Sequence, residues 1–392
     1  RKTVITKKKE LIQIIKLDGL SFETADDEDV DIKKTVRNSL FRSLADGTFA
    51  VWFHTIRRKR SSYPEGKMPP GFAKYLNDAW KLKHSKHESF VNELYITVVR
   101  KADKTGWNKL NHYFKQITDS LDESQRTEAF REAHKELEEA TYRVLATLRD
   151  YNPRILTSVE TENGMMSEPL EFLSLLINGS FGQKVQVPTM DLSHYLATSR
   201  IYFGTRAIEI RSATGTRFAA MLSVKEYAPA TAAGIMDAYL QLPFEFIMCQ
   251  SFSFTNRQTA INKMQTQQRR MTAAEDVAIS QVAEISQALD LAMSGNVAFG
   301  EHQLTVMVVH ENLPALEDAV SQAIAEMVNI GINPVREKLV MEQAYWSQLP
   351  ANFEYIGRKA IINTMNLAGF ASLHNYPTGK INDNHWGNAV TV

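Results

Sequence analysis

The sequence predicts an α+β protein in which one order of secondary-structure elements occurs twice. Its 392 residues exceed what a single hydrophobic core usually organises, so more than one unit is expected. Apolar and charged fractions of 44% and 23% are those of an ordinary globular protein. Short β-branched runs alternate with helical stripes in the order strand, helix, strand, strand, helix, strand. That order is typical of a split βαβ, or ferredoxin-like, unit.

The first predicted unit covers residues 1–163. It opens with the β-branched run Leu11–Leu17, which stops at the turn signal Asp18-Gly19. A helical stripe follows an acidic stretch, as expected near the positive end of a helix dipole. In chain order the expected elements are a strand at 11–17, a helix at 30–44, a strand at 49–56, a short helix at 72–82, a strand at 93–99, a long helix at 124–149 and a strand at 155–159.

The second predicted unit covers residues 218–340 and is joined to the first by a connector over 164–217. The connector is expected to hold a helix at 168–178 and a hairpin at 200–217. The unit itself is expected to hold a strand at 218–227, a helix at 230–242, a strand at 244–254, a helical insertion at about 257–293, a strand at 302–310, a helix at 314–330 and a strand at 335–340. The duplication rests on element order alone, because no residue-level repeat is visible.

Residues 341–392 show little periodicity, and we interpret them as an exit segment that leads to a further domain. The chain begins without a methionine and stops soon after an apolar alternation typical of a starting strand. A longer parent protein is therefore expected.

Charge and composition restrict the class of protein. Lys plus Arg and Asp plus Glu both number 45, so no overall field attracts a polyanion, and direct nucleic-acid binding is not predicted. Apolar runs such as Leu304–Val309 fall far short of the roughly twenty residues that span a bilayer. The single cysteine, Cys249, excludes an internal disulfide and fits a reducing compartment. We expect Cys249 to be a small buried hydrophobe in a cytoplasmic or peripheral protein.

The sequence predicts no catalytic, cofactor or metal site in these residues. A phosphate loop would require GxxxxGK[ST], but the first-glycine position holds His374 and the residue after Lys380 is Ile381. The only close histidine pair, His84 and His87, is flanked by lysines and is expected in a solvated loop. Glu301-His302 and His310-Glu311 would lie at opposite ends of one strand, roughly 25 Å apart, and are interpreted as structural.

A cationic run, Arg57, Arg58, Lys59 and Arg60, directly follows a predicted strand. Four consecutive like charges repel one another unless something compensates them. The run is therefore a candidate contact for anionic lipid head groups or an acidic partner. A solvated strand end is the alternative, and Arg269-Arg270 makes a weaker candidate of the same kind.

Several stretches together resemble one known family, the CagE/TrbE/VirB ATPases that energise type IV secretion and conjugation. The earlier stretches are Val51–Arg58, Leu94–Val99, Glu168–Leu173 with Asn178-Gly179, and Gly300-Glu301-His302. The later and more specific ones are Tyr345–Asn352, His374-Asn375-Tyr376 with Gly379-Lys380, and Trp386-Gly387. Each is weak alone, but their order and spacing are similar to the family's nearly from end to end.

The resemblance implies a position just before a RecA-like motor domain in a longer protein. The family's Walker A, Walker B and arginine-finger residues would lie outside these residues, so ATP and magnesium are expected for the parent protein and no cofactor for this part. Family members are hexamers, peripheral at the cytoplasmic face of the bacterial inner membrane, where N-terminal regions contact inner-membrane subunits. Motor motion is expected to pass through the exit segment, with Trp346, His374, Asn375, Lys380 and Trp386 as candidate coupling residues.

Two other classes of function remain as alternatives. Tandem ferredoxin-like units also occur as stand-alone modules that bind nucleic acid or regulatory ligands through their sheets. Exposed aromatic pairs and a basic sheet face would favour that class, whereas a sheet covered by helices would argue against it. An independent enzyme is the third class, but it would need a convergent acid/base or metal site.

Overall fold

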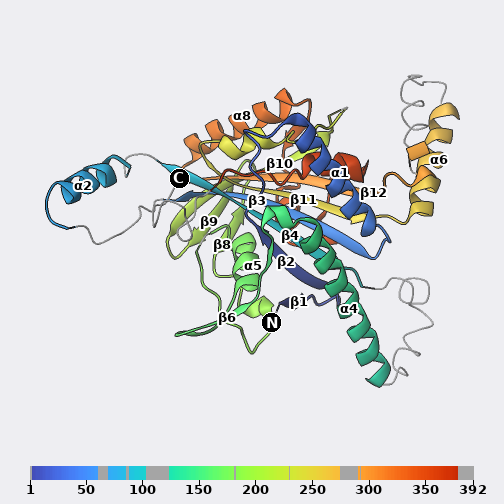
Figure 1. The fold of residues 1–392 in the computed structure, drawn as a ribbon, viewed down its shortest axis with the longest axis horizontal. Coiled ribbons are helices and arrows are strands. Elements are labelled where there is room, and N and C mark those ends of the chain that lie inside the picture. The colour runs from blue at the N-terminus through green and yellow to red at the C-terminus, as the bar shows by residue number, and fades with distance from the viewer. Residues whose placement is uncertain are drawn as a thin grey trace.

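The computed structural model describes residues 2–60, 69–84, 88–102, 123–180, 182–228, 230–273, 290–291 and 293–377. The chain is an α+β protein with a largely antiparallel sheet (Figure 1). Its strands are β1 (Thr3–Ile5), β2 (Leu11–Leu17), β3 (Phe49–Arg60), β4 (Ser89–Arg100), β5 (Arg154–Ile155), β6 (Ser158–Thr161), β7 (Gly164–Ser167), β8 (Arg200–Phe203), β9 (Ile208–Ser212), β10 (Gly215–Glu226), β11 (Glu245–Phe254), β12 (Phe299–His310), β13 (Asn333–Arg336) and β14 (Ala360–Asn363).

The helices vary widely in length. The α-helices are α1 (Asp27–Ser43), α2 (Phe72–His84), α4 (Glu123–Thr147), α5 (Glu168–Asn178), α6 (Arg257–Ala273), α8 (Leu313–Asn329), α9 (Met341–Trp346) and α10 (Thr364–Phe370). Short 3-10 turns are η1 (Arg149–Tyr151), η2 (Leu192–His194), η3 (Asp237–Gln241) and η4 (Phe353–Tyr355). Among the described helices, none combines the length and apolar character that crossing a membrane requires.

Twelve of the described strands form one continuous sheet, with the order β1-β2-β4-β3-β11-β12-β10-β9-β8 along its main path. The sheet has two halves, the first with the order β1-β2-β4-β3 and the second with the order β11-β12-β10-β9-β8. They meet at its centre, where β3 and β11 pair antiparallel from Ala50 opposite Ser253 to Arg57 opposite Phe246. Each half also contains a short strand that pairs antiparallel with one of its longer strands: β5 pairs with β2, and β13 pairs with β10. The local orders are therefore β5-β2-β4-β3 in the first half and β13-β10-β12-β11 in the second.

Both faces of the central strands are buried, because successive side chains of a strand point to opposite sides. In β3, Val51 and Phe53 belong to one core, whereas Ala50 and Trp52 belong to the other. Helices α1, α4, α8 and α10 contribute to the first core, and we call that side of the sheet the α1 face. Helices α5 and α9 contribute to the second core, on what we call the α5 face.

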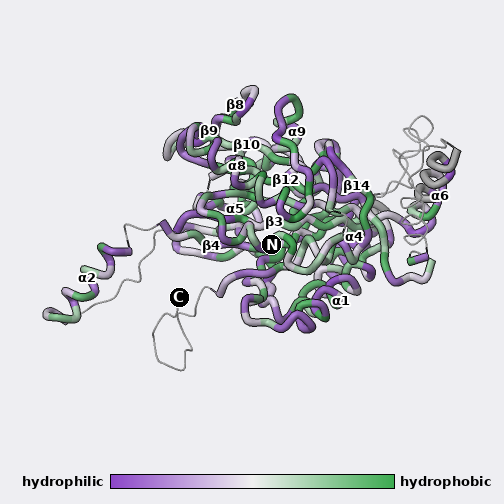
Figure 2. The backbone as a smooth tube through the Cα atoms, turned by 90° about the horizontal axis from the view of Figure 1, so that it is seen from above, coloured by the Kyte–Doolittle hydropathy of each residue, from purple (hydrophilic) through white to green (hydrophobic). Residues whose placement is uncertain are grey.

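Two helices lie away from the sheet at opposite ends of the molecule. Figures 1 and 2 both show α2 beyond one end of the body and α6 beyond the other. None of the side chains of α2 is buried. The start of α6 is attached to the body through Ala260, which packs with Val297 and Phe299. The remainder of the predicted 257–293 insertion lies largely outside the described residues.

Several predicted elements are confirmed, and some with their bounds. β2 and α5 have the bounds predicted from the sequence. Ser167 caps α5 by accepting a hydrogen bond from Leu170 N, and Gly179 ends it in the left-handed region at φ 59°. Cys249 is buried, as expected.

The predicted helix over 230–242 is wrong. Only the 3-10 turn η3 forms there, preceded by turns around Gly234, whose φ is +75°. The Gly234 amide donates to Ser372 Oγ over 2.7 Å, outside its own segment, so a tertiary contact replaces the intrahelical bond. Two strand predictions also need correction. The strand expected at 155–159 is split between β5 and β6, and the strand expected at 335–340 is β13, which ends at Arg336.

Candidate functional site: an anchor for the C-terminal segment

The last described residues are bound to both halves of the sheet, and we call this set of contacts the exit anchor. It consists of residues 372–376 and the groups that they contact around Asp18–Leu20, Asn92 and Gly234–Gln241. The segment arrives from α10, which packs beside α1. Leu373 has a φ of 59°, an uncommon conformation for a leucine, and this residue turns the chain toward the first half.

A backbone bridge joins the anchor to the first half. Leu20 N donates to Leu373 O and Asn375 N donates to Leu20 O, both over 3.0 Å, in a parallel arrangement. Two residues more than 350 positions apart in the chain are thus paired as neighbours.

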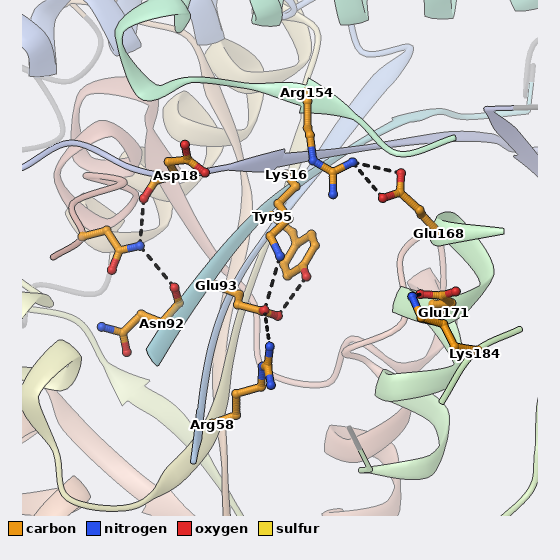
Figure 3. Close-up of polar contacts among 11 residues, drawn as sticks. Lys16, Asp18, Arg58, Asn92, Glu93, Tyr95, Arg154, Glu168, Glu171 and Lys184 are labelled. Carbon is orange, nitrogen blue, oxygen red and sulfur yellow. Dashed lines mark hydrogen bonds and ion pairs between the residues drawn. The ribbon is translucent and has the colours of Figure 1, made fainter. Parts of the chain in front are cut away.

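Asn375 fixes the end of this bridge with its side chain, which is only 5% exposed. Its Nδ2 donates to Asp18 O over 2.8 Å and to Asn92 O over 3.2 Å, and Figure 3 labels these two partners. Gly19 leaves the space for this approach, since a Cβ there would lie 2.5 Å from that of Asn375. Gly19 also has a φ of +91°, which glycine alone adopts easily.

His374 ties the same segment to the second half. Its Nδ1 lies 2.6 Å from Asp237 Oδ2, and its ring stacks on Phe22 with a centroid separation of 4.9 Å. The imidazole is almost fully buried, at 3% exposure. Next to it, Tyr376 hydrogen-bonds Gln241 Nε2. A displacement of residue 374 would therefore act on η3 and on the first half together.

Arg57 packs beside this anchor, and its guanidinium is buried and not at the surface where the predicted cationic contact would need it. Its guanidinium donates to Leu240 O over 2.7 Å, to Leu242 O and to Asn92 Oδ1 over 2.9 Å. The residue is 8% exposed, and burial lowers the pKa of the guanidinium to about 10, so it remains charged at neutral pH. The cause is strand alternation, which directs residue 57 to the α1 face along with Val51 and Phe53.

The other three cations of the run lie at or near the surface. Arg58 Nη2 lies 2.8 Å from Glu93 Oε1, which Lys16 Nζ approaches to 3.3 Å (Figure 3). Burial raises the pKa of Glu93, but Lys16 and Arg58 together outweigh it and leave the pKa lowered. Lys59 pairs with the exposed Glu88, and Arg60 is exposed. A partner or membrane contact by Arg58, Lys59 and Arg60 stays a prediction.

Of the predicted coupling residues, the structure brings His374 and Asn375 together with Arg57. Asn92 joins them, because its side chain accepts from Arg57 while its backbone carbonyl accepts from Asn375. Trp346 lies on the opposite, α5 face, where its ring packs against Tyr345 at a centroid distance of 4.9 Å. Lys380 and Trp386 lie outside the described residues.

Sequence reasoning missed Asp18, Asn92 and Asp237 as members of the site. The turn Asp18-Gly19 was identified only as the end of a strand. No sequence signal marks Asn92, which lies within β4. The Gly234 turn that brings Asp237 to His374 could have been suspected, because a glycine inside a predicted helix is unfavourable.

No group of three His, Cys, Asp or Glu side chains in the described ranges could hold a metal ion. The cavity beside the exit anchor, which His374 and Asp237 help to line, measures about 30 Å³. That is room for a water molecule and not for a nucleotide. A second hollow, of about 200 Å³, contains the ion pair of Glu337 with Arg358.

Two buried histidines near the centre of the sheet are structural. His54 Nε2 lies 2.8 Å from Gln348 O, and burial lowers its pKa to about 4. His302 hydrogen-bonds Tyr227 and Gln250, and burial lowers its pKa to about 3. Both imidazoles are therefore neutral near pH 7.

The fold and the anchor define a class of protein: an α+β scaffold with one continuous sheet, in which a C-terminal segment is bound to both halves. Comparison with known proteins identifies the family. Residues 154–358, just over half of the chain, match the model of the CagE, TrbE, VirB family, a component of the type IV transporter system. Residues 2–106 match the N-terminal domain of the type IV secretion system ATPase VirB4/TrbE.

Curated relatives cover nearly the whole chain. The type IV secretion system protein virB4 of Bartonella henselae is 32% identical over 97% of the chain and 48% of its own length. The virB4 protein of Brucella suis is 30% identical over 100% of the chain and 47% of its own length. PtlC of Bordetella pertussis is 28% identical with the same coverage. The chain belongs to the CagE/TrbE/VirB family, and it spans about half the length of these relatives.

Proposed function

We propose that this chain is the assembly and partner-binding region of a type IV secretion ATPase that energises substrate transfer and pilus biogenesis at the bacterial inner membrane. Family membership supports the proposal. So does the length of the relatives, roughly half of which lies outside the matched region. The nucleotide site of the parent protein, with ATP and magnesium, would lie outside these 392 residues.

Two ferredoxin-like units would form the body of this region. The orders β5-β2-β4-β3 and β13-β10-β12-β11 support this interpretation, since both follow one pattern of four antiparallel strands. The pairing of β3 with β11 would make the two units a single body. In the assembled machine this body would self-associate into a hexamer, peripheral at the cytoplasmic face, and contact small inner-membrane subunits.

The observation that carries the mechanism is that residues 372–376 contact both halves at once. Motion of a motor domain attached through this segment would pull on Asp18 and Asn92 through Asn375 and on Asp237 through His374. Because the halves share one sheet, the body would move as a unit and not change its internal packing. The exit anchor would thus transmit ATP-driven motion to membrane partners.

A stand-alone module that binds nucleic acid through its sheets is less well supported. That function needs an exposed sheet face with aromatic side chains. In the described residues, the aromatic side chains of the two central strands, such as Trp52, Phe53 and Phe246, are buried in cores on both faces.

Hydrolysis of ATP with magnesium, measured on the 392-residue chain and on the full-length protein, tests whether the nucleotide site lies outside these 392 residues. We expect hydrolysis only by the full-length protein. Hydrolysis by the 392-residue chain would overturn the proposal.

Asn375→Ala in the full-length protein tests the coupling. We expect ATP hydrolysis within about twofold of the wild type and substrate transfer reduced at least tenfold, because the side-chain link to the first half is lost. Asn333→Ala is the matched control, since Asn333 is exposed and its side chain donates a hydrogen bond to Glu226, which also lies in the second half. Equal transfer by the two variants, both folded by circular dichroism, would contradict the role of the anchor.

A further inference from the structure

Helix α2 presents an apolar surface that the rest of the described chain does not cover. Its apolar side chains are Phe72, Ala73, Tyr75, Leu76, Ala79, Trp80 and Leu82, and none is buried. Trp80 is 50% exposed and Phe72 is 78% exposed. At about 100° per residue these side chains occupy one half of the helix circumference, whereas Lys74, Asp78 and Lys81 lie on the other. Side chains of this size are normally covered.

The helix is held at the tip of an arm. Pairing of β3 with β11 stops at Arg57, but pairing of β3 with β4 continues to Arg60 opposite Ser89. The two strands therefore extend beyond the body as a two-stranded ribbon. Helix α2 comes between them in the chain and lies beyond their ends in Figure 1. A helix of 13 residues without packing is marginal in water. The arm thus places an unpacked amphipathic helix away from the core that could have stabilised it.

The residue types of α2 fit one kind of surface. Aromatic rings with a polar edge, such as Tyr75 and Trp80, favour the boundary between lipid head groups and acyl chains. The helix carries three lysines against one aspartate in a chain whose overall charge is zero. Lys83, which lies on the apolar half, holds its Nζ 5.1 Å from the centre of the Trp80 ring. A long lysine in this position can keep its charge in the head-group layer while its stem lies on apolar surface.

We propose that α2 is an interfacial helix that lies in the surface of an anionic lipid bilayer, with its aromatic face toward the acyl chains. The helix is about 20 Å long, which suits lying in the surface and not crossing it. Arg58, Lys59 and Arg60 then lie on the ribbon behind the helix, near the head groups. This inference rests on the proposed function for its location at a membrane, and it assigns the membrane contact to a definite element.

Flotation of the 392-residue chain with vesicles tests the proposal. The probes are vesicles of phosphatidylcholine alone and of three parts phosphatidylcholine to one part phosphatidylglycerol. We expect binding to the mixed vesicles that weakens as ionic strength rises, and at least tenfold weaker binding to phosphatidylcholine alone. Failure to float with the mixed vesicles would overturn the proposal.

The variant Leu76→Glu with Trp80→Glu removes two apolar side chains from α2 and should reduce binding at least tenfold without altering the unfolding transition. A matched control is Val328→Glu with Leu339→Glu, which makes the same changes at exposed apolar positions elsewhere, 57% and 101% exposed. The control should float like the wild type. Lys74→Gln with Lys83→Gln should weaken binding about fivefold for each charge. Equal flotation of the α2 double variant and its control would exclude α2 as the lipid contact.

A protein partner is the other outcome. If the α2 variant lost a co-purifying membrane subunit but kept its affinity for vesicles, the surface would be a protein-binding one and the lipid proposal would be wrong. The same variant in the full-length protein should retain ATP hydrolysis. If the unaltered chain failed to bind vesicles while coupling through Asn375 was still observed, the lipid proposal would be wrong and the proposed function would stand.

Discussion

The two halves of the sheet cover the α1 face in different ways. In the first half a helix of 17 residues, α1, connects β2 to β3. In the second half, the described residues of the corresponding connection between β10 and β11 form only the five-residue turn η3. The C-terminal segment helps to fill the place of the absent helix, because Phe370 stacks on His302 and packs edge-on against Tyr227. The second half is therefore completed by residues that come after it in the chain.

The largest expected effect concerns two buried aromatic side chains. The test is whether Phe370 stabilises the core of the second half as much as Phe41 of α1 stabilises the core of the first. Both side chains are at most 3% exposed, and Phe41 packs edge-on against Phe53. Phe41→Ala and Phe370→Ala should each lower the free energy of unfolding by about 3–5 kcal/mol, because each leaves a cavity in one core. Urea denaturation measures both values.

Phe72→Ala serves as the control for these substitutions, since Phe72 is 78% exposed on α2, and it should change the free energy of unfolding by less than about 0.5 kcal/mol. If Phe370→Ala lowered the free energy of unfolding by less than about 1 kcal/mol, the C-terminal segment would not be part of the core. The comparison between the halves would then fail.

A second prediction concerns the glycines that admit the C-terminal segment to each half. Gly19→Ala should lower the free energy of unfolding by about 2–4 kcal/mol, because its Cβ meets Asn375 and Leu94 in addition to the strain of a positive φ. Gly234→Ala should cost somewhat less, since its nearest contact is the Asp237 carboxylate. Gly215 has a φ of +139° and open space around it, so Gly215→Ala should lower the free energy of unfolding by about 1 kcal/mol through backbone strain alone. Equal losses at all three positions would show that the close approach adds nothing.

The smallest expected effect is the pH dependence contributed by one buried histidine in each half, His54 and His302. Burial lowers their pKa values to about 4 and about 3 from an ordinary value near 6.5. The unfolded state therefore binds protons first, so stability is complete above about pH 6.5 and falls as the pH decreases. Between pH 7.5 and 5.5 each histidine should remove about 1 kcal/mol from the free energy of unfolding.

Substitution by glutamine separates the two contributions. His54→Gln and His302→Gln should each reduce the fall in stability between pH 7.5 and 5.5 by about 1 kcal/mol, whatever their effect at pH 7.5. Urea denaturation at the two pH values gives the slopes. An unchanged slope in either variant would mean that its histidine becomes protonated without loss of the fold.

Much of the fold follows from local patterns in the sequence. β2 and α5 were predicted with their bounds because a β-branched run and a capped helical stripe are local signals. The predicted helix at 230–242 failed because its apolar spacing was outweighed by Gly234 and by contacts with residues near 372. The short elements α9, β14 and α10 in the predicted exit segment have four to seven residues, too few for a period to be recognised.

The site was less predictable than the fold, because its contacts join distant parts of the chain. Arg57 was grouped with three other cations, although strand alternation alone separates its side chain from that of Arg58. His374 and Asn375 were found through a family resemblance, but their partners Asp237 and Asp18 carry no motif. A single sequence does not show that Asn92 would accept hydrogen bonds from both Arg57 and Asn375.

The bridge between Leu20 and His374 also sets the timing of biosynthesis. About 350 residues separate the two strands of this bridge, as they do Asp18 and its partner Asn375. At synthesis rates of about 5–20 residues per second, residues 372–376 are synthesised roughly 20–70 s after the part of the first half that they contact. Until then the groups that receive residues 372–376 remain uncovered on a nascent chain. These groups are therefore accessible to chaperones until residues 372–376 have been synthesised.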